Sequence, residues 1–270
     1  MDTIYVAVFS VTSIGVICAA LLCIASKLMY VQTDERITEL LEILPGANCG
    51  ACGYPGCTGY ASALLGGGVK GNLCTPGGPA AAEKIGAMLG IEAGTVEKKS
   101  AVVHCRGDVQ KKKMDYSGIR SCGAARQLFG GEGSCAFGCL GYGDCLKVCP
   151  VSAICIENSL ARINTNLCTG CGLCVKACPN ALITIEKTDR AATVMCKNAE
   201  KGAAVRKKCT NGCIACGKCV KECPAGAIVM EDNLARIDYA KCTDCGRCAE
   251  VCVTKSIQPF AKPMLIDKAS

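Results

Sequence analysis

The chain has 270 residues, of which 27 are cysteines, 7 are tyrosines, 4 are phenylalanines and none is tryptophan. This aromatic content is too low to fill one large hydrophobic core, so either disulfide bonds or bound metal must hold the soluble part together. His104 is the single histidine, which excludes repeated Cys2His2 zinc sites, and the formal charge of +7 comes without an aromatic platform for stacking nucleic-acid bases.

Residues 1–30 are predicted to form a membrane anchor. From Ile4 to Met29 the chain is apolar or small except for Lys27, and this length allows a helix to cross a hydrocarbon core of about 30 Å. A cleaved signal peptide would begin with positive charge, whereas here Asp2 precedes the span and the cation follows it. This charge bias places the rest of the chain in the cytoplasm, and the alternative is a buried helix of a soluble protein.

Residues 31–92 are predicted to form a small cluster-binding domain. Apolar residues recur at helical spacing from Ile37 to Leu44, and Pro45 ends this short helix. Next comes a glycine-rich C-x2-C-x4-C-x16-C group, formed by Cys49, Cys52, Cys57 and Cys74. Glycines let backbone amides turn toward a large anion, so the group favours one [4Fe-4S] cluster, with a zinc ion as the alternative. An alanine-rich helix is expected near residues 80–89.

The second half of the chain contains a repeat of 74 residues. The segment from Leu160 to Asn164 recurs from Leu234 to Asp238, and seven cysteines recur with it. In the first copy these are Cys139, Cys145, Cys149, Cys168, Cys171, Cys174 and Cys178, and in the second they are Cys213, Cys219, Cys223, Cys242, Cys245, Cys248 and Cys252. Such self-similarity indicates a duplicated domain.

The four cysteine runs of the repeat resemble those of bacterial two-cluster ferredoxins. Three runs end in C-x3-C-P, at Pro150, Pro179 and Pro224, and the fourth has Val253 in place of proline. In these ferredoxins each C-x2-C-x2-C-x3-C-P run gives three ligands to one [4Fe-4S] cluster and the fourth ligand to the other. The resemblance covers about residues 130–260 and implies an α+β fold for each copy, with two short β-hairpins and two helices.

The same resemblance implies the ligands of four clusters. In the second copy one cluster takes Cys213, Cys216, Cys219 and Cys252, and the other takes Cys242, Cys245, Cys248 and Cys223. In the first copy one cluster takes Cys168, Cys171, Cys174 and Cys149. The remaining site departs from the pattern, because Tyr142 stands where the second copy has Cys216. We assign that site Cys135, Cys139, Cys145 and Cys178, which brings the expected number of [4Fe-4S] clusters to five.

These assignments divide the soluble part into the cluster domain (31–92), a connecting region (93–130), a first ferredoxin-like module (131–187) and a second module (188–270). The connecting region is charged and expected to be exposed over residues 92–116. Apolar runs at residues 153–156 and 227–230 are the expected strands, which makes Cys155 a core thiol.

Four cysteines of the soluble part have no role in this scheme, namely Cys105, Cys122, Cys196 and Cys209. Two spacings follow the repeat, because Cys122 and Cys196 are 74 residues apart, as are Cys135 and Cys209. We interpret the four as buried structural thiols. The alternatives are ligands of a sixth cluster or another metal, and partners in disulfide bonds.

An N-terminal apolar helix, a C-x2-C-x4-C-x16-C domain and two ferredoxin-like modules in this order resemble the family of B subunits of the Rnf complex. That complex is an ion-translocating ferredoxin:NAD+ oxidoreductase. The resemblance implies a subunit, anchored in the lipid bilayer, that takes electrons from reduced soluble ferredoxin and relays them to the membrane subunits of the complex. Flavins and the NAD site would belong to partner subunits, since this chain has no G-x-G-x-x-G motif after a strand, no Walker A motif and no histidine-based acid or base.

The charge and the order of modules add two expectations. Each oxidised cluster with four thiolates carries about two negative charges, so five clusters would change the net charge to about −3, and nucleic acid is not an expected partner. The Cys49 site follows the membrane span closely and is expected to pass electrons to a membrane partner. Ferredoxin is then expected to dock on an outlying module, with Lys218, Lys221 and Arg247 as candidates for electrostatic steering.

Three other functions stay open on the sequence. The nearest is a ferredoxin-like adaptor subunit of another membrane oxidoreductase, such as a hydrogenase or a formate dehydrogenase. The second is a corrinoid or methyl-transfer protein, whose cluster domain can resemble residues 49–74. The third is a zinc-binding interaction scaffold.

Overall fold

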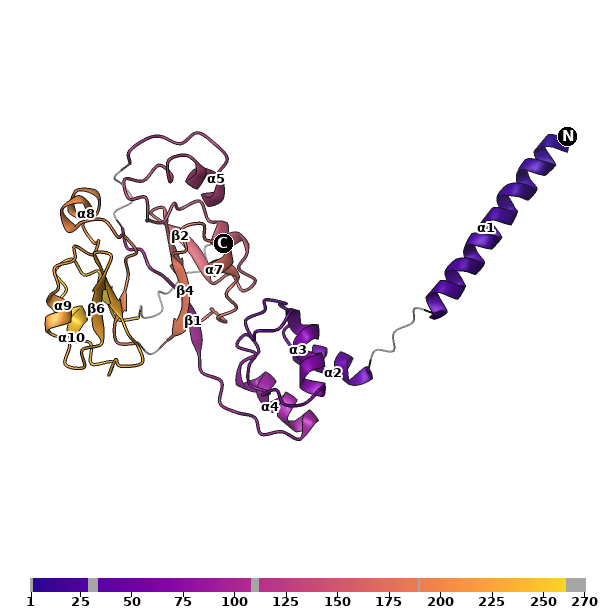
Figure 1. The fold of residues 1–270 in the computed structure, drawn as a ribbon, viewed down its shortest axis with the longest axis horizontal. Coiled ribbons are helices and arrows are strands. Elements are labelled where there is room, and N and C mark those ends of the chain that lie inside the picture. The colour runs from indigo at the N-terminus through magenta and orange to yellow at the C-terminus, as the bar shows by residue number, and fades with distance from the viewer. Residues whose placement is uncertain (1, 29–33, 108–111, 189, 261–270) are drawn as a thin grey trace. The chain divides into compact units, whose positions relative to one another are not determined.

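The computed structural model describes residues 2–28, 34–107, 112–188 and 190–260, and Figure 1 shows its elements. It divides into two compact units, Met1–Glu39 and Leu40–Ser270. The second unit combines short helices with four two-stranded antiparallel sheets, as expected of an α+β fold.

Helix α1 (Asp2–Leu28) makes up most of the first unit. Its segment Ile4–Leu28 is long and apolar enough to cross a membrane, and its large apolar side chains are exposed, as for Phe9 with 75% of its surface accessible. Such a surface is costly in water and favourable in hydrocarbon, so the helix suits a bilayer. The predicted span agrees with the helix as far as Leu28, and Met29 lies outside the described residues.

Three helices form the cluster domain: α2 (Glu35–Ile43), α3 (Gly56–Leu65) and α4 (Gly78–Leu89). Each contributes a fully buried side chain, namely Leu40, Tyr60 and Ile85. Helix α4 has a proline in its first turn and a left-handed Gly90 at its end, which are favourable residues for these positions. The short amphipathic helix and the alanine-rich helix therefore occur where the sequence predicts them.

Among the described residues, the first module and the region before it contain two sheets and three short helices. Strand β1 pairs with β4, and the hairpin of β2 and β3 pairs Ile154 with Ile163. The elements are β1 (Lys99–Val103), α5 (Cys122–Gln127), α6 (Asp144–Lys147), β2 (Ile154–Glu157), β3 (Leu160–Ile163), α7 (Leu173–Ala177) and β4 (Ile183–Lys187).

From its second helix onward, the second module repeats the helices and strands of the first 74 residues later, whereas its first strand and first helix do not follow this spacing. Its hairpin pairs Ile228 with Ile237, and β5 pairs with β8. The elements are β5 (Thr193–Val194), α8 (Gly202–Lys208), α9 (Lys218–Lys221), β6 (Ile228–Glu231), β7 (Leu234–Ile237), α10 (Arg247–Glu250) and β8 (Ile257–Gln258). In both modules only one of the two sheets is a hairpin, whereas the sequence predicted two hairpins.

Strand β1 lies within the region that the sequence predicted to be an exposed connection. Residues 100–103 are buried, because β4 pairs with them from the far end of the module. The next residue, His104, is also buried, and its two ring nitrogens lie 2.6 Å from the Val194 carbonyl oxygen in β5 and from the Thr184 hydroxyl in β4. The only histidine of the chain thus connects the sheets of the two modules.

The core of each module is built partly from cysteines. In the second module Cys213, Cys219 and Cys248 are buried together with Ile228 and Ile257. In the first module, Cys145 and Cys174 occupy the same place among small and branched apolar side chains. Cys155 is an exception to the prediction, since it is only half-buried on the hairpin, where its thiol contacts the Glu157 carboxylate at 3.5 Å.

Candidate metal centres

The four cysteine runs of the two modules fold in the same way. A left-handed glycine, such as Gly172 (φ 77°) or Gly246 (φ 76°), starts each short helix. A chain reversal of this kind favours glycine, which lacks a Cβ atom. Each helix then carries one buried cysteine, namely Cys145, Cys174, Cys219 or Cys248. The last cysteine of each run lies one or two residues beyond the end of this helix.

Backbone amides point at the sulfur atoms of these last cysteines. The N–H groups of Ala153, Leu182 and Ala227 donate to the Sγ atoms four residues earlier, with N···S distances of 3.3, 3.4 and 3.3 Å. In the fourth run the Sγ atom of Cys252 lies 3.3 Å from the Ser256 hydroxyl. Hydrogen bonds of this kind stabilise a thiolate and tune the reduction potential of a metal cluster.

The cysteines of the cluster domain lie near one another at the start of α3 and before α4. The amide of Cys57 donates to the Asn48 side chain at 2.8 Å, and the hydroxyl of buried Tyr60 contacts the amide of Leu73, next to Cys74, at 3.3 Å. Burial raises the pKa of the Cys74 thiol, and the nearby thiolates of Cys57, Cys52 and Cys49 raise it further. These four are the cysteines that the sequence groups into one site.

Two cavities in the modules each contain four cysteines in the crossed arrangement of a ferredoxin. One is lined by Cys149, Cys168, Cys171 and Cys174, and the other by Cys213, Cys216, Cys219 and Cys252. In each set three cysteines come from one run and the fourth from the other run. The structure therefore brings together the same residues that the ferredoxin resemblance groups.

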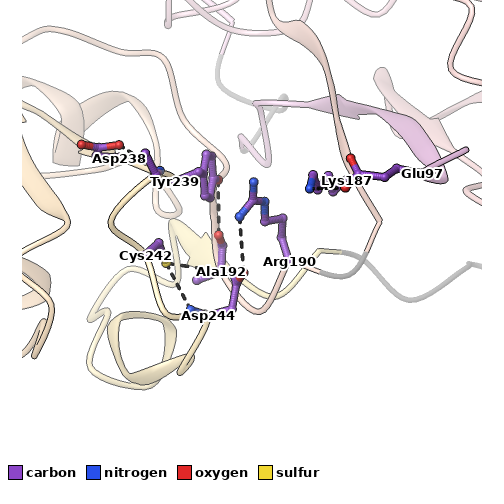
Figure 2. A network of polar contacts seen from close by, with 9 residues as sticks. Glu97, Lys187, Arg190, Ala192, Asp238, Tyr239, Cys242 and Asp244 are labelled. Carbon is purple, nitrogen blue, oxygen red and sulfur yellow. Dashed lines mark hydrogen bonds and ion pairs between the residues drawn. The ribbon is translucent and has the colours of Figure 1, made fainter. Parts of the chain in front are cut away.

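The loop of Cys242 is held by a polar network between the start of the second module and its last cysteine run (Figure 2). The guanidinium of Arg190 lies 3.3 Å from the Asp244 carboxylate and stacks 4.1 Å from the centre of the Tyr239 ring. The Asp244 amide in turn donates to the Sγ atom of Cys242 at 3.4 Å.

The first three cysteines of the last run of the second module lie close together. Burial raises the pKa of Cys248 to about 11, and the neighbouring thiolates of Cys242 and Cys245 contribute. The fourth cysteine predicted for this site, Cys223, packs against the buried residues around Cys248.

At the remaining site of the first module, the structure brings Cys139, Cys145 and Cys178 together with a different cysteine from the one we assigned. Its cavity is lined by Cys122, Cys139, Cys145 and Cys178, whereas Cys135 lines a neighbouring cavity. Burial, followed by the thiolates of Cys139 and Cys122, raises the pKa of Cys145 to about 12. The geometry therefore favours Cys122 in place of Cys135 at this site.

Asp144 explains the position of Cys122. Its carboxylate accepts hydrogen bonds from the Ser121 hydroxyl at 2.8 Å and from the Gly123 amide at 3.0 Å. The residues on both sides of Cys122 are thus bound to the neighbour of Cys145. The sequence signal for this was the missing cysteine at Tyr142 combined with an unassigned cysteine on the repeat spacing.

The donor sets fit iron–sulfur clusters better than single metal ions. Within the described residues, no three Cys, His, Asp or Glu side chains are placed to hold one ion. A zinc ion would draw four sulfurs to about 2.3 Å from a common point. A four-iron cluster spaces its thiolates more widely, because irons and sulfides lie between them, and its cavity here is otherwise lined by apolar residues such as Val151 and Ile185.

Family models match three parts of the chain. A model described as a putative Fe-S cluster matches residues 44–76, a 4Fe-4S binding domain matches residues 161–184, and a 4Fe-4S dicluster domain matches residues 212–256. These matches cover the cluster domain and parts of both modules, and they support [4Fe-4S] clusters as the bound groups.

Curated relatives cover most of the chain. The B subunit of the Na+-translocating ferredoxin:NAD+ oxidoreductase complex of Acetobacterium woodii is 40% identical over 88% of this chain and 72% of its own. The B subunit of the proton-translocating complex of Clostridium ljungdahlii is 40% identical over 96% of this chain and 93% of its own. The chain belongs to the family of Rnf complex B subunits. A third member, from Methanosarcina acetivorans, is 39% identical over 91% of this chain and 94% of its own.

Membership in the family of Rnf B subunits confirms the resemblance inferred from the sequence. The chain is an iron–sulfur electron-transfer subunit of a multi-subunit oxidoreductase complex, so other Rnf subunits are its partners. The apolar helix α1 agrees with membrane anchoring in such a complex.

Proposed function

We propose that this chain accepts electrons from reduced soluble ferredoxin through its second module and relays them, through the first module and the cluster domain, to membrane subunits of an ion-translocating ferredoxin:NAD+ oxidoreductase. The cysteine groups described above would hold [4Fe-4S] clusters, which supply one-electron transfer when bound. The large C-terminal part would lie on the cytoplasmic side, where ferredoxin is found. No residue of this chain is required to make or break a covalent bond.

The exposure of the cysteines carries this proposal. Within the soluble part, only Cys216 and Cys245 are exposed, and both belong to the second module. The first module shields its cysteines, since Cys145, Cys171 and Cys174 are buried and the others are half-buried. The rate of electron tunnelling falls steeply with distance, so a soluble donor needs a cluster near the protein surface. The two cysteine sets of the second module each place an exposed cysteine there.

Positive side chains surround the exposed cysteines. Lys218 and Lys221 lie on α9 and Arg247 lies on α10, and all three are exposed. Soluble ferredoxins are usually acidic, and complementary charge raises the rate of association. The charges therefore support docking on this face of the module.

At its other end, the first module contacts the cluster domain. The Lys176 ammonium on α7 donates to the Cys49 carbonyl oxygen at 3.3 Å. A Cβ atom added at Gly170 would lie 3.2 Å from the Thr75 methyl group, so the residues beside Cys171 and Cys74 are neighbours. The cysteine groups of the two parts therefore adjoin.

The test is anaerobic reduction of the full chain in detergent by reduced ferredoxin, followed by visible absorbance. The double variant Cys49→Ala/Cys52→Ala should keep the initial rate and lose only the share of absorbance change that belongs to one cluster. The matched double variant Cys242→Ala/Cys245→Ala should slow the initial rate.

Two results would overturn the proposal. If removal of the Cys49 site abolished reduction of the other sites, electrons would enter at the cluster domain, and the direction would be reversed. If neither double variant changed reduction by ferredoxin, the second module would not be the docking site.

A further inference from the structure

A cavity between the two modules is lined by Cys139 of the first module's set and by four further cysteines from three separate segments. Cys105 follows β1, Cys135 precedes the first run of the first module, and Cys196 and Cys209 flank α8 in the second module. Asn211 connects these segments, because its side-chain amide donates to the Arg106 carbonyl oxygen at 2.8 Å. None of the chain's cysteines forms a disulfide bond, although all of them lie in the described residues.

Hydrogen-bond donors point at three of the four sulfurs. The Cys139 amide donates to the Sγ atom of Cys105 at 3.4 Å. Asn198 donates twice, from its backbone amide to Cys196 at 3.5 Å and from its side-chain amide to Cys135 at 3.3 Å. A neutral thiol is a weak acceptor, whereas a thiolate is a strong one. Donors at these positions therefore suit thiolates.

The environment of Asn198 strengthens this point. Its side chain is only 2% exposed, and its position is fixed by a second hydrogen bond to Glu200 at 3.2 Å, which in turn pairs with Lys208. The fourth sulfur lies close to the others, since a Cβ atom added at Gly107 would be 3.4 Å from Sγ of Cys105 and 3.7 Å from Sγ of Cys209. The site is thus formed by buried polar groups aimed at sulfur.

Structural thiols do not account for this arrangement. Cys209 is buried, and Cys105, Cys135 and Cys196 are half-buried around the cavity. Neutral thiols behave as small apolar groups that fill space in a close-packed core. Here they surround a cavity and receive polar donors, which a packing role does not require.

The repeat explains why these cysteines are available. Cys122 and Cys196 are equivalent, but the second module has Cys216 where the first has Tyr142. The first module therefore uses Cys122 to complete its own site, whereas in the second module Cys216 fills that place and leaves Cys196 for the cavity between the modules.

We propose that Cys105, Cys135, Cys196 and Cys209 hold a sixth [4Fe-4S] cluster, placed between the two modules. With this group, every cysteine outside α1 except Cys155 belongs to a set of four. Each of the four thiols releases its proton when it binds iron. The proposal extends the proposed function, because the site joins the cysteine sets of both modules.

The position of the site agrees with such a link. On one side, the amide that donates to Cys105 belongs to Cys139, a member of the first module's set. On the other, the Cys213 amide forms a hydrogen bond with Cys196, and Cys213 belongs to a set of the second module. The cavity therefore adjoins one cysteine set in each module.

The experiment is native mass spectrometry of the full chain, purified anaerobically in detergent, with iron and sulfide analysis of the same sample. We expect six clusters, or about 24 iron and 24 sulfide atoms per chain. The variant Cys196→Ala/Cys209→Ala should contain five clusters, with about 20 of each atom. The matched control Cys18→Ala/Cys155→Ala removes two thiols outside the cavities and should keep all six.

A wild-type mass with five clusters would overturn the proposal, as would a Cys196→Ala/Cys209→Ala chain that keeps the wild-type number. The wild-type mass decides the question even if the double variant fails to fold. Neither readout involves ferredoxin, so a failure of the proposed electron donor would leave the cluster number unaffected.

Discussion

The two modules share one plan and differ in how they supply and shield their cysteines. In the first, Asp144 binds the backbone beside Cys122 and brings this cysteine to the site that Tyr142 leaves incomplete. The equivalent residues of the second module are Lys218, Cys196 and Cys216. There the lysine is exposed, the run is complete, and Cys196 lies in the cavity between the modules. A few substitutions in a repeat thus move one cysteine from one site to another.

Removal of iron should have the largest effect. Because cysteines form part of both cores, we expect the chelated chain to lose its cooperative fold over both modules, since binding of metal and folding are coupled. The second module should lose iron first, because only it exposes cysteines. Timed chelation combined with limited proteolysis would show which module loses its iron first. If the modules stayed protease-resistant without iron, the metal would not be needed for the fold. If the first module lost its iron earlier, the difference in exposure between the modules would not control iron loss.

The exchange of ligands between the modules can be tested by moving a cysteine. Cys122→Ala should remove the cluster of Cys139, Cys145 and Cys178, a loss of about four iron atoms. Adding Tyr142→Cys should restore it, because the first module then has the complete run of the second. Iron analysis and electron paramagnetic resonance of both variants provide the measurement. If the Cys122→Ala variant kept the wild-type amount of iron, Cys135 would be the fourth ligand of this site, as we assigned it from the sequence.

The network around Arg190 belongs to the second module alone, since the equivalents of Arg190 and Asp244 are Tyr116 and Gly170. Arg190→Met should lower the free energy of unfolding by about 1–2 kcal/mol, because it removes an ion pair and a contact with the Tyr239 ring. Denaturant titration followed by cluster absorbance measures the effect.

The matched control for this network is Arg236→Met. Arg236 pairs with Glu231 at 2.9 Å, but both side chains are more than half exposed. Such an exposed ion pair contributes little to stability, so the variant should lower the free energy of unfolding by less than about 0.5 kcal/mol. Equal costs for the two variants would show that the Arg190 network does not stabilise the Cys242 loop.

The smallest expected effect concerns ferredoxin docking. Lys218→Glu/Lys221→Glu should lower the association rate by about tenfold at low salt, and the difference should shrink as salt screens the charges. Lys147→Glu is the control, because Lys147 is the equivalent of Lys221 in the first module. Stopped-flow reduction at several salt concentrations gives the rates. Equal slowing by the control would mean that the chain's net charge, rather than the second module, attracts ferredoxin.

The sequence by itself determined the features that depend on local spacing. Apolar length indicated the span of α1, and the resemblance of the cysteine runs to those of two-cluster ferredoxins grouped the sets of Cys171 and Cys219, which the structure brings together. The duplication was visible because side chains at equal spacing recur, and strands β2 and β6 occur at the expected residues.

Only the tertiary structure decided which distant segments meet. Strand β1 looked like a charged connection until β4 paired with it. A hydrogen bond from Gly123 to Asp144, 21 residues away, helps to place Cys122 rather than Cys135 in the cavity with Cys139 and Cys145. The four cysteines between the modules come together in the same way, through contacts such as that of Asn211 with Arg106. Local spacing cannot encode such contacts, because they depend on how separately folded segments pack against one another.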